Sequence, residues 1–294
     1  MSQTPPTPPP GGPPPPPPPR SADPGGGRRT RTRQRTSLSR VPSPYGLWIA
    51  LFSVLIFIAP NLVVLGIAGT AALETVAQES TSLIVVNLLF GLILQLVVFG
   101  LALLPVLFAG RPFSRLLGPT RTTPAMVGIG LATGFVVAFA SYTVNAIAVL
   151  ISGSTEPVEQ QLLQDALAGG VPLILVTLLA IVVAPLAEEV IFRGVLFRAL
   201  AGRLTVTVGA LLSAIVFAVI HFEVVFSQPV ALLGLFTIGL LLAVAYHLTG
   251  NLLVPIIAHG VFNAISIGLT VLVERLDLEE LVEVAALVGL PVPL

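Results

Sequence analysis

The feature that most constrains this chain is a series of apolar segments that are almost free of charge. At a rise of ~1.5 Å per residue, a helix of ~20 apolar residues crosses the ~30 Å hydrocarbon core of a bilayer. Apolar side chains make up 55% of the 294 residues and charged ones only 10%, whereas about a quarter of a soluble domain is charged. Because this composition cannot cover a water-facing surface, the sequence predicts an all-α, polytopic transmembrane helical bundle.

Seven segments satisfy this length rule, and one further segment falls short of it. The seven predicted spans are 46–69, 83–109, 125–152, 171–197, 205–222, 230–249 and 251–273. The stretch 281–294 is too short to cross comfortably, so it either dips into the membrane or forms a half-length eighth helix. We therefore expect seven to eight spans. They form an N-terminal group over 46–152 and a core over 171–273, followed by an acidic and apolar segment over 274–294.

The charges between the spans predict the orientation. The loops on the side of the N-terminus contain Arg111, Arg115, Arg121, Arg198 and Arg203, whereas the opposite loops contain acidic residues. Since cytoplasmic loops are enriched in basic residues, the N-terminus is predicted to be cytoplasmic. The basic residues are all arginine, and proline and alanine are frequent. This composition favours an integral protein of a bacterial plasma membrane.

The first 45 residues differ from the rest of the chain. Residues 1–45 contain Pro-rich and Gly-rich runs, followed by a basic run from Arg28 to Arg40. Such a composition predicts a disordered tail with polyproline II stretches. The tail either contacts a Pro-binding module or anionic lipid headgroups, or is a solvated segment that only sets the topology. The formal net charge of zero argues against nucleic acid as a partner.

Three of the predicted spans contain polar residues that are costly in lipid. They are Glu188, Glu189 and Arg193 on the fourth span, His221 on the fifth, and His259 and Asn263 on the seventh. Ionisable residues at membrane depth face the interior of a bundle and mark functional sites. Small residues are also present inside a span: Gly130 and Gly134 are four residues apart, a spacing typical of close helix packing.

The spacing of the polar residues predicts that they meet. The fourth and fifth spans leave one turn near Leu204; Glu188 lies 16 residues before it and His221 lies 17 after it. Equal distances from one turn predict a similar depth in the membrane. Residues four apart share a helix face, so Glu189 is expected to pair with Arg193. Glu188 points ~100° away from Glu189 and is free to face another group.

These residue types permit hydrolysis of an amide bond. A carboxylate removed from bulk water is a better base near neutral pH, so Glu188 could take a proton from a water that His221 helps to hold. His259 and Asn263 could donate hydrogen bonds to the resulting oxyanion. Alternatively, Glu188, His221 and His259 could bind a divalent metal such as Zn²⁺ and leave one position open for water. The residue types alone do not decide between these two sets of roles.

The three motifs together resemble the CPBP family of intramembrane peptidases. The motifs are Glu-Glu-x-x-x-Arg at 188–193, Phe-x-x-x-His at 217–221 and His-x-x-x-Asn at 259–263. The family includes CAAX prenyl endopeptidases (Rce1-like) and Abi proteins of bacteriocin processing or self-immunity, and the resemblance covers roughly residues 171–270. It implies a catalytic Glu188, with His221 as its partner and His259 and Asn263 at the oxyanion. Glu189 and Arg193 are then supporting residues.

We therefore expect an intramembrane endopeptidase, whose partners are membrane lipids and a peptide or protein substrate. Family members are labelled metalloproteases, but a metal-free glutamate mechanism is also assigned to the family, and we favour the latter, which requires no cofactor. The alternatives are a transporter or proton-coupled carrier, since buried ionisable groups also form relays, and a non-catalytic membrane scaffold. No inverted repeat supports a carrier, because the polar motifs lie only in the C-terminal half.

Overall fold

The computed structural model describes residues 46–68, 81–109, 117–118, 122–153, 170–221 and 229–275. All of its helices belong to one compact unit, Leu38–Leu294. The elements are α1 (Leu47–Ala68), α2 (Thr81–Phe108), α3 (Pro124–Ser152), α5 (Gly170–Leu178), η2 (Leu179–Val183), α6 (Ala184–Glu189), η3 (Val190–Phe197), α7 (Arg198–Arg203), α8 (Val206–Val219), α10 (Ala231–Thr249) and α11 (Leu253–Arg275).

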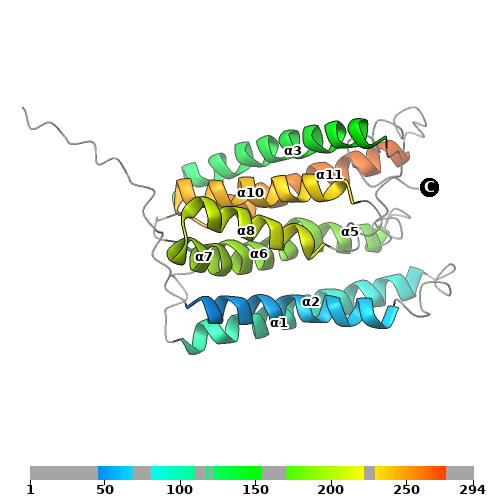
Figure 1. Cartoon of the computed structure of the whole chain (residues 1–294). Coiled ribbons are helices and arrows are strands. Elements are labelled where there is room, and N and C mark those ends of the chain that lie inside the picture. Colours follow the sequence, from blue (N-terminus) through cyan, green and yellow to red (C-terminus); the bar gives the residue numbers. More distant parts are fainter. Residues whose placement is uncertain are drawn as a thin grey trace, which may run out of the picture. The chain divides into compact units, whose positions relative to one another are not determined.

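The described part of the chain is all-helical and contains no strand, which confirms the predicted fold class. Each of the seven predicted segments forms a helix (Figure 1). Five of these helices are long and apolar enough to cross a membrane, counted over the described residues. The predicted tail over 1–45 and the stretch 281–294 lie outside the described residues.

The fifth predicted segment, 205–222, is shorter than expected. Its helix, α8, has 14 residues and rises only about 21 Å. Thr205 caps its start by accepting a hydrogen bond from the backbone N–H of Val208, as N-cap threonines commonly do. The helix ends at Val219, so His221 lies beyond the helix on which it was predicted to lie.

The helices pack in a pattern that surrounds one long central helix. This helix runs without a break from Gly170 to Arg203 and contacts α1, α2, α8 and α11. The helix pair α1 and α2 packs on one part of it, while α3 packs on α10 and α11 (Figure 1). All eight residues of η3, the central segment, are buried. Of the predicted site residues, Arg193 lies in this fully buried segment.

Two segments of the long helix, η2 and η3, are π-helical. A π turn bonds residue i to i+5 and contains more residues than an α turn, so it rotates every later side chain around the axis. The two segments flank α6, which contains Glu188 and Glu189. The two carboxylates therefore point in directions that a regular α-helix over the same residues would not give them.

Glycines bring α3 and α11 into close contact. A Cβ on Gly130 would lie 2.8 Å from Cβ of Ile257, and one on Gly134 would lie 2.5 Å from Cβ of Val261. Real Cβ atoms do not approach so closely, and only glycine permits this separation of the helices. The predicted role of the two glycines in helix packing is confirmed.

Candidate active site

Glu189 and Arg193 form a fully buried ion pair. Nη1 of Arg193 donates to Oε1 of Glu189 over 2.6 Å, and both side chains are 0% exposed. Nη2 of Arg193 donates to the backbone carbonyl of Gly239 on α10 over 2.9 Å. This confirms the predicted i,i+4 pair and adds a link from the long helix to α10.

His259 lies between two carboxylates. Its Nδ1 is 3.0 Å from Oε1 of Glu189, and its Nε2 is 4.0 Å from Oε2 of Glu188. Since a carboxylate accepts, Nδ1 is the donor of the first contact, and Nε2 is directed towards Glu188. Glu188 and Glu189 thus lie nearest to different nitrogens of the same imidazole ring from α11.

Glu188 is the more accessible of the two glutamates. Its side chain is 14% exposed, compared with 0% for Glu189. Oε2 of Glu188 is itself buried and has no hydrogen-bond partner among the described residues. The gap of 4.0 Å between this oxygen and Nε2 of His259 is too long for a direct hydrogen bond.

His221 terminates α8 with its own side chain. Nδ1 of its ring lies 2.8 Å from the backbone carbonyl of Phe217, while its backbone N–H donates to Ala218 over 3.2 Å. The side chain thus replaces the backbone donor that Phe217 would have in a continuing α-helix. Because a carbonyl only accepts, Nδ1 carries a hydrogen, and in the neutral form of the ring Nε2 is an acceptor.

The ring of Phe217 joins the residues of the site. Its centroid is 4.8 Å from that of His221 and 5.8 Å from that of His259. The guanidinium of Arg193 lies over the ring, 4.6 Å from its centroid, in the geometry of a cation–π contact. The motif identified Phe217 by position alone; its contacts with all three polar residues appear only in the structure.

Asn263 has a partner that the sequence did not predict. Its Nδ2 donates to the backbone carbonyl of Ala180, in the π-helical segment η2, over 2.6 Å. Asn263 is thus near the site but bonded to the long helix. Its predicted role at an oxyanion stays a prediction.

A metal site was the alternative interpretation of Glu188, His221 and His259. Among the described residues, no group of three or more His, Cys, Asp or Glu side chains is arranged to hold a metal ion. The three residues therefore do not fit a three-ligand site as they stand, and we derive no step through a metal.

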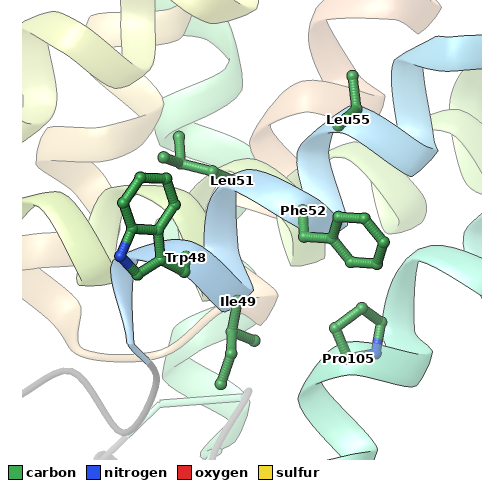
Figure 2. Close-up of a pocket in the computed structure, with 6 residues that line it drawn as sticks. All are labelled: Trp48, Ile49, Leu51, Phe52, Leu55 and Pro105. Carbon is green, nitrogen blue, oxygen red and sulfur yellow. The ribbon is translucent and has the colours of Figure 1, made fainter.

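Two apolar pockets lie outside this cluster. A pocket of about 510 Å³ contains none of the six predicted site residues (Figure 2); it is lined by Trp48, Ile49, Leu51, Phe52, Leu55 and Pro105. A groove of about 350 Å³ runs between the long helix and α11, where Ile181 and Leu186 face Gly260 and Ala264. This groove lies along the two helices that supply Glu188 and His259.

Comparison with known proteins supports the resemblance. Residues 170–265 match an Rce1-like family. Its model is described as type II CAAX prenyl endopeptidase Rce1-like, and the matched range contains all six predicted site residues.

The chain is also similar to a curated protein of Escherichia coli named "Uncharacterized 24.3 kDa protein". The two are 33% identical over 117 residues, which cover 39% of this chain and 51% of that protein. The chain therefore spans about half the length of this curated relative. No solved structure matches the chain.

Proposed function

We propose that this chain is an intramembrane endopeptidase in which Glu188 activates water. The observation that carries the proposal is the position of His259, held at Nδ1 by buried Glu189 while Nε2 faces Glu188 across 4.0 Å. The Rce1-like match over residues 170–265 supports the same activity. A half-buried carboxylate beside an oriented imidazole is an arrangement suited to general acid–base chemistry.

In this proposal, Glu188 is the general base. A water beside Glu188 transfers a proton to the carboxylate, and its oxygen attacks the carbonyl carbon of the scissile amide. The protonated Glu188 then gives that proton to the amine nitrogen as the C–N bond breaks. Nε2 of His221 accepts a hydrogen bond from the second O–H of the water and thereby orients the water.

His259 stabilises the oxyanion. Since its Nδ1 hydrogen is already donated to Glu189, Nε2 can donate only when the ring is an imidazolium. In that form the charges of Glu188, Glu189, Arg193 and His259 cancel. A charge-balanced cluster avoids the penalty of an isolated buried charge, and the imidazolium presents a preorganised donor where negative charge develops.

The substrate we propose is a membrane-associated protein or peptide, of the CAAX prenyl type that the family description names or of a bacterial type processed within the membrane. We also propose the cytoplasmic N-terminus and bacterial plasma membrane that the loop charges predict. The family description supports the first substrate class and the composition supports the second, so the first assay offers both substrate types.

The test is cleavage by purified full-length protein in nanodiscs. The substrates are a farnesylated CAAX peptide, the same peptide without the prenyl group, and a labelled library of transmembrane peptides. Each is incubated with wild type, Glu188→Gln and Ser266→Ala, with and without a chelator. Ser266 serves as the matched control, because it bonds Tyr142 on α3 and none of the acid–base groups.

We expect cleavage by wild type and Ser266→Ala, and none by Glu188→Gln, which removes the base while keeping the size of the side chain. Normal cleavage by Glu188→Gln would refute the role of Glu188. Loss of wild-type activity with the chelator, restored by added Zn²⁺, would refute the metal-free mechanism. If none of the three substrates is cut by wild type, the peptidase proposal fails for these substrate classes.

A further inference from the structure

A proline inside the long helix leaves a carbonyl without its usual donor. In an α-helix the N–H of residue i+4 bonds the carbonyl of residue i, and in a π turn the N–H of i+5 does so. For Ala180 these donors belong to residues 184 and 185. The N–H of Ala184 is already bonded to Leu179, and Pro185 has no N–H.

Asn263 supplies the missing donor from the neighbouring helix. Its Nδ2 lies 2.6 Å from the oxygen of Ala180. One turn earlier on α11, Gly260 makes room for the next carbonyl, since a Cβ there would lie 2.6 Å from the oxygen of Ile181. The carbonyls of Ala180 and Ile181 thus both face α11: the first is hydrogen-bonded to Asn263, and the second lies against Gly260, where there is no side chain. An unsatisfied carbonyl in lipid is costly, so this contact stabilises the distorted turn.

The distorted turn sets the direction of the proposed base. Glu188 lies three residues after Pro185 and five after the end of η2. Restoring regular α geometry over η2 would rotate every later side chain of the helix around its axis. The carboxylate of Glu188 would then lose its position opposite Nε2 of His259.

We infer that Asn263 is a positioning residue: it holds the turn that Pro185 opens, and so aims Glu188 at His259. This inference rests on the proposed function and assigns Asn263 a role different from donation to the oxyanion. The two roles make opposite predictions about Pro185. If Asn263 positions the turn, its substitution should matter little once residue 185 has an N–H that can bond the carbonyl. If Asn263 is an oxyanion donor, its substitution should cost the same whether residue 185 is proline or alanine.

The experiment is a double-mutant cycle of Asn263→Ala and Pro185→Ala, measured as kcat and KM in nanodiscs. In the wild-type background we expect Asn263→Ala to lower kcat about 100-fold, the scale expected for a misplaced catalytic group, with little change in KM. In the Pro185→Ala background the same substitution should cost no more than about 10-fold. Equal losses in both backgrounds would overturn the inference and favour the oxyanion role.

The same cycle is measured for stability in the Glu188→Gln background, where catalysis plays no part. Asn263→Ala should destabilise the protein with Pro185 present and have little effect once Pro185 is alanine. Ser266→Ala, three residues away on α11, serves as the control and should have the same effect in both backgrounds. If Asn263→Ala behaves like this control, the inference is wrong.

The stability cycle separates the two proposals. If Pro185→Ala is itself inactive, the kinetic cycle cannot be completed, and the stability cycle alone tests the inference. If wild type cleaves nothing, the proposed function fails, while a coupled stability cycle still supports the contact between Asn263 and the turn at Pro185.

Discussion

Replacing Arg193 by methionine tests whether the buried charges at the centre of the bundle compensate one another. Methionine fills much of the same space but removes three contacts. These are the 2.6 Å bond to Glu189, the 2.9 Å bond to the Gly239 carbonyl, and the guanidinium over Phe217. Glu189 would remain a fully buried carboxylate whose one described partner is Nδ1 of His259.

The expected loss of unfolding free energy is large. Removing one partner of a buried ion pair costs about 3–5 kcal/mol, because the other charge stays buried and unpaired. A hydrogen bond between neutral groups of transmembrane helices contributes about 0.6 kcal/mol on average. Arg193→Met should therefore destabilise the protein several times more than Ser266→Ala, which removes two hydrogen bonds between neutral groups, one to Tyr142 and one to the carbonyl of Phe262.

A second substitution should restore stability. In the double variant Glu189→Gln/Arg193→Met, no carboxylate is left unpaired at position 189, while the amide oxygen can still accept from His259. Replacement of both partners of a buried pair is often close to neutral. We thus expect the double variant to be more stable than Arg193→Met alone, although it has lost one more native side chain.

The assay is equilibrium unfolding in mixed SDS micelles, followed by circular dichroism, for wild type, both single variants, the double variant and Ser266→Ala. The reasoning is refuted if Arg193→Met loses no more than the Ser266→Ala control. It is also refuted if the double variant is less stable than Arg193→Met. In either case the ion pair would not be the main source of the stability at this position.

Two further substitutions test the packing and the site. Gly260→Ala should cost about 1–3 kcal/mol of unfolding free energy, the scale of overpacking, because its Cβ would lie 2.6 Å from the oxygen of Ile181. The control is Gly268→Ala on the same helix, where a Cβ meets nothing within 4 Å. It should be tolerated in the same unfolding assay. His221→Ala should lower kcat about 10²- to 10⁴-fold, the range for a lost acid–base partner. Because it also leaves the Phe217 carbonyl without the ring donor it has in the structure, folding of the variant is checked in the same unfolding assay. Retained cleavage by a folded His221→Ala would remove His221 from the mechanism.

Local patterns were sufficient to predict most of the helices and one contact of the site. Apolar length alone located the membrane helices, because a span has to cover the hydrocarbon core whatever its tertiary contacts. The pair of Glu189 and Arg193 follows from i,i+4 spacing within a single helix. The small-residue spacing of Gly130 and Gly134 likewise predicted a contact that depends on side-chain size alone.

The position of His221 and the partner of Asn263 were not predicted, because both depend on departures from regular helix geometry. Counting by four assumes an α-helix, but the segments η2 and η3 are π-helical, and α8 ends before His221. The partner of Asn263 is a backbone carbonyl 83 residues away, which no side-chain pattern indicates. One local signal was present: Pro185 stands inside an apolar span, three residues before Glu188, and a proline there removes a helix hydrogen bond.

The two histidines of the site differ in one respect that separates their proposed roles. Each ring donates its Nδ1 hydrogen, so in both cases Nε2 is the atom left for the reaction. His221 donates to a neutral carbonyl at the end of its own helix, and there a neutral ring suffices to accept a hydrogen bond from water. His259 donates to the carboxylate of Glu189, and the proposed mechanism requires its ring to be an imidazolium, whose Nε2 is a donor. In the proposed mechanism the neutral ring of His221 thus supplies an acceptor and the imidazolium of His259 supplies a donor, and the group bonded to Nδ1 distinguishes the two histidines.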